Sequence, residues 1–264
     1  MTVNLAGARV LLTGATGGLG HAMARALHAK GANLVLTGRR TDVLEPLANE
    51  LGARAIAADL STADGVQKLL EEAGDVDVLI ANAALPGMGQ VTDLSVEEID
   101  RNLGVNLRTP IVMARAVVPA MVARGGGHIV FIGSVSGIVA SPGAAMYNAT
   151  KFGLRGFAAA LRQDLHPSGV GVSIVEPGFV RDAGMAVEGG LIDNLPRGAR
   201  TVSPEQVGDA VVRAITKNKG EIVVAPGEFR LASAFGQIAP EMNAKVQRLS
   251  GAADMMAKTV GRKN

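Results

Sequence analysis

Two side chains four residues apart, a tyrosine and a lysine, have the clearest chemical potential in this sequence. They lie in the segment Tyr147-Asn148-Ala149-Thr150-Lys151, and on an α-helix that spacing places both on one face, one turn apart. A phenol with a pKa of about 10 is a poor base at neutral pH, and a nearby ammonium favours its phenolate form. Tyr147 is the only tyrosine in the chain, so any acid/base chemistry by a tyrosine must be its own.

A serine could complete this chemistry. Ser134 follows the apolar run 127–133, and the carboxyl ends of parallel strands are where such sheets bind ligands. A hydroxyl at that edge could polarise a carbonyl beside the phenol. In isolation, Ser134 also fits an ordinary turn, and a Tyr-x-x-x-Lys pair also fits an ordinary helix surface.

A glycine-rich turn joins the first apolar run to the first helical pattern. Glycine permits a tight turn and lets backbone N–H groups approach phosphate, at the positive end of the following helix dipole. The strict G-x-G-x-x-G spacing is not met, and a plain tight turn is the alternative. We expect the turn to bind a dinucleotide through Gly14, Thr16, Gly17, Gly18, Leu19 and Gly20.

The second strand ends at Thr37-Gly38-Arg39-Arg40. Enzymes that use NAD usually place a carboxylate there for the ribose 2′-hydroxyl, whereas an arginine can bind the 2′-phosphate of NADP. No acidic residue precedes Asp42. The sequence therefore predicts NADP(H) rather than NAD(H), with Arg39 as the phosphate-binding residue.

Short apolar runs alternate with longer helical patterns along most of the chain, and several runs are continuously apolar, as in strands covered on both faces. This pattern predicts a single α/β domain, doubly wound (Rossmann), with a parallel seven-stranded sheet and helices on both faces. The expected strands are 8–13, 33–37, 53–58, 77–81, 127–133, 170–176 and 221–225, and the expected helices are 18–30, 41–51, 62–73, 95–123, 145–166 and 204–217.

Two later segments are less regular. Residues 182–203 carry few periodic signals, and a long loop inside a compact domain is usually functional, so we expect a substrate loop there. Residues 229–264 are expected to form a C-terminal helical extension, with a helical pattern over 229–257 that breaks near Pro240. The domain itself is expected to span 1–264.

Composition excludes several classes of function. The 264 residues contain no cysteine, which removes thiol nucleophiles and Cys-ligated metals. Few aromatics and dispersed basic residues argue against nucleic-acid binding. We see no secretion signal and no apolar run of about 20 residues, so we expect a cytoplasmic protein without a transmembrane span. No metal site is expected, because the histidines lack ligand spacing (His21, His28, His128 and His166).

Together these features resemble the short-chain dehydrogenase/reductase family, in its short single-domain branch. The resemblance covers roughly residues 7–225, and the joint match is far more specific than any one motif. The matching residues, in the family's order and spacing, are Gly14, Gly18, Gly20, Asp59-Leu60, Asn82-Ala83, Asn106, Ser134, Tyr147-x-x-x-Lys151 and Pro177-Gly178.

The resemblance implies four catalytic residues. Tyr147 would give or take the hydroxyl proton, Lys151 would hold the nicotinamide ribose and support the phenolate, and Ser134 would orient the carbonyl. Asn106 would bind a water that links Lys151 to solvent. The resemblance also implies cofactor contacts from Asp59, which would meet the adenine, from Leu60, Asn82 and Ala83, and from Pro177, Gly178 and Val180, which would line the nicotinamide.

One detail supports the role of Asn106 without the resemblance. Pro110 has no N–H and cannot bond the carbonyl of residue 106. If one helix runs through both residues, that carbonyl is free to accept a hydrogen bond from water. A straight, fully bonded helix at 106–110 would contradict this hypothesis.

The sequence departs from the family pattern at three places. Ala84 stands where a glycine usually ends the motif after the fourth strand. Asp182 stands near the place of a threonine that holds the nicotinamide carboxamide, and we assign it no role. The Gly-Gly ending of members that resemble β-ketoacyl reductases is absent, so their tetramer is not assumed, although we expect a homodimer or homotetramer.

The expected function is therefore hydride transfer between NADP(H) and an alcohol/ketone substrate, with Tyr147 as acid/base. Apolar residues around the expected pocket favour a hydrophobic small molecule (Ile138, Val139, Ala140, Met146 and Met185). Two alternatives remain: a non-catalytic NADP-binding sensor or scaffold, and a sugar-nucleotide epimerase/dehydratase, for whose substrate domain the chain has little room. The substrate itself and the direction of the reaction stay open.

Overall fold

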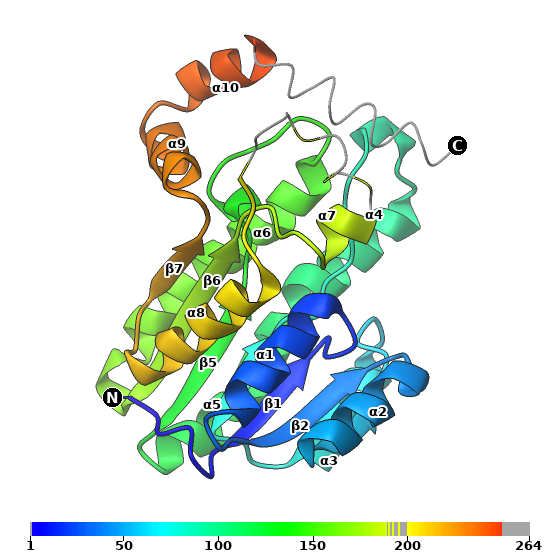
Figure 1. Cartoon of the computed structure of the whole chain (residues 1–264), viewed down its shortest axis with the longest axis vertical. Helices are drawn as coiled ribbons and strands as arrows, with labels where there is room; N and C mark the ends of the chain where they lie inside the picture. Colours follow the sequence, from blue (N-terminus) through cyan, green and yellow to red (C-terminus); the bar gives the residue numbers. More distant parts are fainter. Residues whose placement is uncertain (1, 189, 191, 193–194, 196–199, 250–264) are drawn as a thin grey trace.

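The computed structural model describes residues 2–188, 190, 192, 195 and 200–249. Its centre is one parallel sheet with the strand order β3-β2-β1-β4-β5-β6-β7 (Figure 1). The predicted doubly wound, seven-stranded fold is confirmed, and each strand lies within two residues of its predicted ends. The strands are β1 (Arg9–Thr13), β2 (Asn33–Gly38), β3 (Arg54–Ala57), β4 (Val78–Ala81), β5 (Gly127–Ile132), β6 (Val170–Pro177) and β7 (Glu221–Val224).

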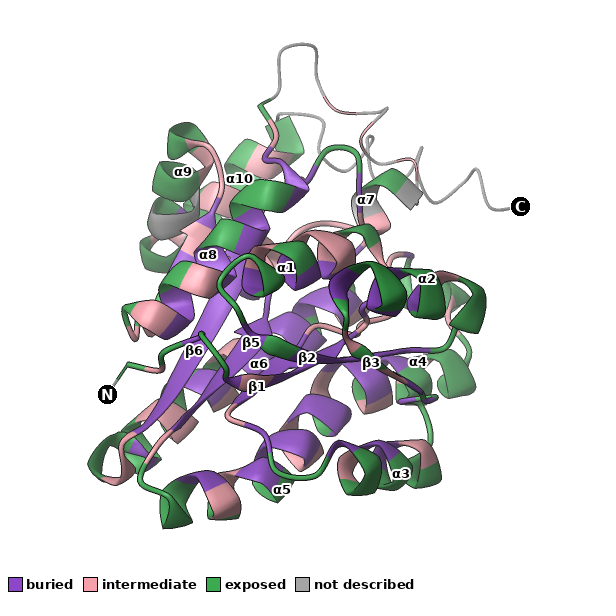
Figure 2. Cartoon of the chain, turned by 60° about the horizontal axis from the view of Figure 1, so that its bottom comes forward, coloured by how far each residue is buried: buried purple, intermediate pink, exposed green. Residues whose placement is uncertain are grey.

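Helices cover both faces of this sheet (Figures 1 and 2). One apolar core lies under α1, α2 and α8, and the other under α3, α5 and α6. The central strands β5 and β6 are buried along their whole length, which explains why most of their residues are apolar. The helices are α1 (Gly18–His28), α2 (Thr41–Leu51), α3 (Ala63–Ala73), α4 (Val96–Leu103), α5 (Thr109–Ala123), α6 (Ala145–Asp164), α7 (Met185–Glu188), α8 (Pro204–Thr216), α9 (Gly227–Ile238) and α10 (Pro240–Leu249).

The predicted helix 95–123 is continuous but irregular. Between α4 and α5 lies a π-helical turn, Gly104–Arg108, in which the N–H of Thr109 donates to the carbonyl of Gly104, five residues earlier. The helix through Asn106 and Pro110 is therefore not a regular α-helix, and π turns of this kind are frequent at functional sites.

The same helix, Val96–Ala123, is long and apolar enough by length and composition to cross a membrane, alone among the helices of the described residues. Core helices of globular proteins also meet this criterion. In this protein Met113, Ala114, Val117 and Met121 pack into the core under the sheet. Packing in the core therefore accounts for the apolar composition of this helix.

The residues at the two ends of the segment 182–203 are hydrogen-bonded to each other. Val180 and Val202 form a parallel β-bridge, the N–H of Arg181 donates to the carbonyl of Val202, and the N–H of Val202 donates to that of Phe179. The short helix α7 lies in the first part of this segment. The expected break of the C-terminal pattern near Pro240 is confirmed between α9 and α10, and residues 250–264 of the extension lie outside the described part.

A buried histidine holds the amino end of β5, far from the predicted site. His128 has no exposed surface, and its Nε2 lies 2.7 Å from the Ser173 hydroxyl. That hydroxyl donates its one proton to the carbonyl of Lys219 at 2.6 Å, so Nε2 must be the donor to Ser173. Burial, with a smaller contribution from the charge of Arg162, lowers the pKa of His128 to about 3.

His128 makes the free energy of unfolding depend on pH. Its folded pKa lies below the unfolded value, so the unfolded chain binds the extra proton as pH falls below 6.5, and folding loses free energy. Between about pH 7 and about pH 5 the loss from this group is about 2 kcal/mol. We expect His128→Gln, whose amide nitrogen can replace Nε2, to lose less stability than the native chain over that interval in urea unfolding. Equal acid losses in both proteins would contradict this assignment.

Candidate active site

A cleft of about 420 Å³ opens at the carboxyl ends of β1, β2 and β4. It lies beside the point where the strand order reverses between β1 and β4, which is where open α/β sheets bind ligands. The predicted cofactor residues that line it are Gly14, Thr16, Gly17, Gly18, Leu19, Gly20, Arg39, Asp59, Leu60, Asn82 and Ala83.

The glycine turn has little room for side chains. Gly14 has φ +65°, and a Cβ there would come within 2.9 Å of the Cα of Ala83. A Cβ on Gly20 would come within 2.3 Å of the Gly14 carbonyl oxygen. Helix α1 begins directly after Gly17, which offers no side chain to cap it, so its first N–H groups face the cleft available for an anion.

Two arginines line the far end of the cleft and differ in their contacts. The Arg40 guanidinium donates to the carbonyl of Thr16 at 2.5 Å, which ties it to the glycine turn. Arg39 is exposed, and within the described residues it makes no hydrogen bond or ion pair. Its charge acts to lower the pKa of Asp59, after the larger effects of hydrogen bonds from Ser61. Of Arg39 and Arg40, therefore, Arg39 is the one whose guanidinium is free for a ligand.

Two asparagine side chains form hydrogen bonds with main-chain groups of the site. The Asn82 side chain donates to the carbonyls of Thr13 at 2.9 Å and Gly14 at 3.1 Å, which joins the end of β4 to the glycine turn. The Asn106 side chain accepts from the N–H of Leu85 at 2.7 Å and donates to its carbonyl at 2.8 Å. The side chain of Asn106 thus holds the loop after β4. Pro110 has no N–H to donate to its main-chain carbonyl, and the water that this carbonyl would bind stays a prediction.

Ser134, Tyr147 and Lys151 meet at the carboxyl end of β5, as predicted. Tyr147 and Lys151 lie on one face of α6, with the Lys151 Nζ 5.5 Å from the centre of the Tyr147 ring. The Nζ donates to the carbonyl of Ile132, the last residue of β5, at 2.9 Å. Ser134 begins a short 3₁₀ turn, Val135–Gly137, and its hydroxyl accepts from the N–H of Ser136.

The acid/base properties of this cluster follow from burial. Tyr147 is 7% exposed and Lys151 is 3% exposed. Burial raises the pKa of Tyr147 to about 12, against the lowering effect of a hydrogen bond with Ser134. Burial lowers the pKa of Lys151 to about 8, while the charge of Glu176 acts to raise it. The phenol therefore stays protonated at neutral pH in the protein by itself, rather than being displaced toward phenolate.

The predicted residues after β6 lie beside this cluster and outside the lining of the cleft. Pro177 ends β6, the N–H of Gly178 donates to the carbonyl of Val224 at 2.9 Å, and Val180 is held by its bridge to Val202. Asp182 has φ +63°, is exposed and pairs with Arg181 at 3.6 Å.

An apolar group surrounds the phenol. Ala144 and Tyr147 are packed against Met88, Phe179 and Met185. Of the residues expected around the pocket, Met185 belongs to this group, whereas Ile138 is buried in the interior. Sequence reasoning missed Met88 and Phe179, which have no motif of their own. It also missed cleft residues that only the fold brings together, namely Gly38, Arg40, Ala58, Ser61, Ala84, Leu85, Arg101, Val105 and Gly184.

Comparison with known proteins agrees with this geometry. Residues 8–189 match the family model "short chain dehydrogenase". The ketoacyl reductase HetN of Nostoc sp. is 34% identical, over 96% of this chain and 93% of that protein. Among solved structures, a 3-ketoacyl-(acyl-carrier-protein) reductase from Brucella melitensis complexed with NADH has a TM-score of 0.77 at 29% identity, covering 84% of this chain and 98% of that one. A metagenomic short-chain oxidoreductase in complex with NADP has a TM-score of 0.70 at 30% identity, covering 84% and 97%.

The sheet, the cleft at its switch point and the group of polar residues beside it define an oxidoreductase of the Rossmann class. More specifically, the chain belongs to the short-chain dehydrogenase/reductase family.

The single tyrosine allows a direct test of the site's electrostatics. With one tyrosine and no tryptophan in the chain, the ultraviolet absorbance of phenolate reports Tyr147 alone. We expect its titration to lie well above the ordinary value of about 10 and to move higher still in Ser134→Ala, because the lowering hydrogen bond is lost. A titration at or below 10 in the folded native protein would show that burial does not control this phenol.

Proposed function

We propose that this protein is an NADP(H)-dependent oxidoreductase that transfers a hydride between the nicotinamide and an alcohol/ketone substrate, with Tyr147 as the acid/base. The observation that carries the proposal is the meeting of Ser134, Tyr147 and Lys151 at the end of β5. A hydroxyl that can bind a carbonyl oxygen, a phenol that can protonate it and an ammonium beside the phenol are the groups that carbonyl reduction needs.

The cleft fits a dinucleotide. The start of α1 supplies unbonded N–H groups for a pyrophosphate. The glycines at 14 and 20 allow the turn to pack this closely against Ala83 and against itself, where a side chain would collide. Arg39 supplies an exposed cation where a 2′-phosphate would lie, which favours NADP(H) over NAD(H). When bound, the cofactor supplies or accepts the hydride.

The residues of this chain supply the proton. Ser134 and Tyr147 would hold the carbonyl oxygen, and Tyr147 would give that oxygen its phenolic proton as hydride reaches the carbonyl carbon, so that the ketone becomes an alcohol. The Lys151 ammonium would then stabilise the phenolate left behind. The raised pKa of Tyr147 in the protein alone keeps the phenol protonated at neutral pH, so it holds the proton that reduction of the carbonyl needs.

The substrate class follows from the walls of the site. Met88, Phe179 and Met185 pack around Ala144 and Tyr147, and methionine side chains adapt to varied apolar shapes. A hydrophobic carbonyl compound fits these surroundings. That HetN is named a ketoacyl reductase agrees with such a substrate.

Replacing the proton donor tests the assignment directly. We expect Tyr147→Phe to lower ketone-dependent NADPH oxidation by about 10²- to 10⁴-fold, because the proton transfer is lost, while NADPH binding by calorimetry changes little. A panel of apolar ketones measured with the native protein provides the reference. NADPH binding without turnover of any ketone by the native chain would favour a non-catalytic sensor or scaffold instead.

Cofactor choice has a separate test. We expect Arg39→Ala to weaken NADPH binding by roughly tenfold or more, the equivalent of a hydrogen bond to a charged group, and to leave NADH binding unchanged. Arg115→Ala, which removes an exposed arginine from α5, is the matched control. An unchanged ratio of NADPH to NADH affinity in Arg39→Ala would remove Arg39 from this role.

A further inference from the structure

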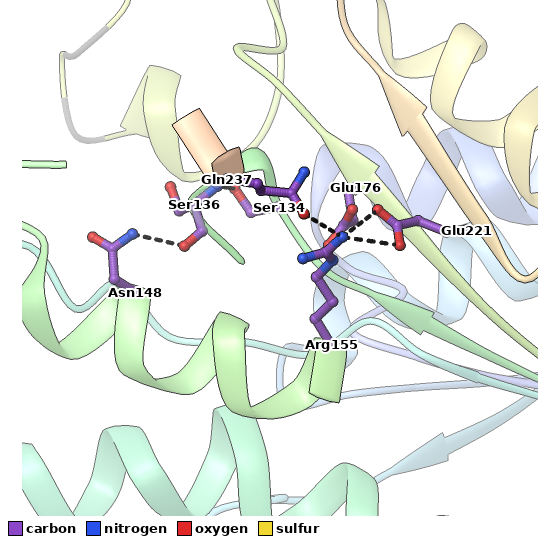
Figure 3. A network of polar contacts seen from close by, with 7 residues as sticks. All are labelled: Ser134, Ser136, Asn148, Arg155, Glu176, Glu221 and Gln237. Carbon is purple, nitrogen blue, oxygen red and sulfur yellow. Dashed lines mark hydrogen bonds and ion pairs between the residues drawn. The ribbon is translucent and has the colours of Figure 1, made fainter. Parts of the chain in front are cut away.

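The residue next to Tyr147 in α6 joins that helix to the loop after β5. Successive residues of an α-helix point about 100° apart, so Asn148 faces a different direction from Tyr147. Its side-chain nitrogen donates to the carbonyls of Ser136 at 2.6 Å and Val139 at 3.1 Å, and its side-chain oxygen accepts from the N–H of Ser141 at 3.2 Å. Figure 3 shows the first of these bonds, which runs from α6 to the 3₁₀ turn after β5.

These three hydrogen bonds require the amide of Asn148. The side chain is almost fully buried, with 7% of its residue exposed, and a buried polar side chain needs hydrogen-bond partners. An asparagine offers two N–H donors and one carbonyl oxygen. In this site the donors meet two main-chain carbonyls, and the oxygen meets one main-chain N–H. An aspartate would lack both donors, and a serine hydroxyl has a single proton to donate.

The 3₁₀ turn Val135–Gly137 also lies directly against the main chain of α6. A Cβ on Gly137 would come within 2.7 Å of the Lys151 carbonyl oxygen, so the turn and the helix are packed without a side chain between them. Ser134 begins this turn, and its carbonyl accepts from the N–H of Gly137 at 2.7 Å. The Ser134 hydroxyl accepts from the N–H of Ser136 at 3.1 Å. Two contacts with α6 therefore hold the turn that carries the Ser134 hydroxyl.

We propose that Asn148 is a positioning residue that sets the Ser134 hydroxyl against the Tyr147 phenol. The connection runs through Ser136, whose carbonyl binds the Asn148 side chain and whose N–H binds the Ser134 hydroxyl. Asn148 and Tyr147 are consecutive in α6, so the loop is attached to the helix directly beside the phenol.

The catalytic consequence rests on the proposed function. Ser134 and Tyr147 must reach one carbonyl oxygen together, and a misplacement of about 1 Å can lower a rate by about 10²-fold. We therefore expect Asn148→Ala to lower kcat for ketone reduction by about 10²-fold. The loss should be much smaller in the Ser134→Ala background, because residues that act as a unit have non-additive effects. NADPH binding by calorimetry should change little, since Asn148 lies outside the lining of the cleft.

The positioning itself can be measured without cofactor or substrate. Tyr147 is the only tyrosine in the chain, so the ring Cζ of ¹³C-labelled tyrosine gives one NMR signal in the folded protein at neutral pH. This carbon carries the phenolic oxygen and responds to its hydrogen bond with Ser134. We expect Asn148→Ala to move the signal in the same direction as Ser134→Ala, by up to the same amount. In the Ser134→Ala background, Asn148→Ala should move it no further.

Two further variants serve as controls. Asn33→Ala removes another asparagine whose side chain donates to a main-chain carbonyl, that of Gly7 at 2.9 Å at the amino end of β2, and should leave the Tyr147 signal and kcat unchanged. Asn148→Ser keeps one donor and should give a smaller shift of the same sign. If Asn148→Ala fails to fold, as judged by circular dichroism, Asn148→Ser decides the question. A merely structural role would lower stability, and any shift of the signal would not depend on Ser134.

Three results would overturn the role of Asn148: an unmoved Tyr147 signal in Asn148→Ala, an equal shift with and without the Ser134 hydroxyl, or an unchanged kcat. Failure of the proposed function gives a different result. A Tyr147 signal that shifts as expected, without turnover of any ketone by the native protein, would reject the proposed function and leave the positioning by Asn148 in place.

Discussion

The burial of one ammonium group governs the arrangement of this site. Lys151 is almost fully enclosed, and removing a charged group from water costs several kcal/mol unless other groups replace its hydration. The carbonyl of Ile132 accepts a hydrogen bond from the Lys151 Nζ at 2.9 Å. A negative charge on Glu176, at the end of β6, would also favour the ammonium form of Lys151. These contacts require that the end of β5, the first turns of α6 and the end of β6 meet at one point. The parallel sheet meets that requirement, because β5 and β6 are neighbours whose carboxyl ends lie at the same edge.

Much of this framework could be predicted from the sequence because buried parallel strands have a simple signature. β5 and β6 are enclosed along their whole length, so their sequences are nearly continuous apolar runs with readable ends. The glycine turn was equally readable, since steric contacts at Gly14 and Gly20 admit no side chain. The π turn at Gly104–Arg108 was not, because one widened turn leaves the apolar pattern of the surrounding helix almost unchanged.

Residues whose roles depend on contacts between distant segments were harder to predict. The two hydrogen bonds between the Asn106 side chain and the main chain of Leu85 join residues 21 apart. No local sequence pattern predicts such a contact. Glu176 did carry a signal: it is an acidic residue inside an apolar run, Val175-Glu176-Pro177. A strand buried on both faces implies a buried carboxyl there, and a buried carboxyl implies partners. Arg155, one helical turn beyond Lys151, was the partner that the same spacing rule could have found.

Burial keeps Tyr147 a neutral phenol in the protein alone, although a nearby ammonium favours the phenolate. Burial favours the neutral phenol more strongly than the Ser134 hydrogen bond opposes it. A neutral phenol suits proton donation, so reduction of a carbonyl needs no change in the resting site. Oxidation of an alcohol requires the phenolate, whose formation depends on nearby positive charge. Lys151 supplies such a charge, with its Nζ 5.5 Å from the centre of the Tyr147 ring.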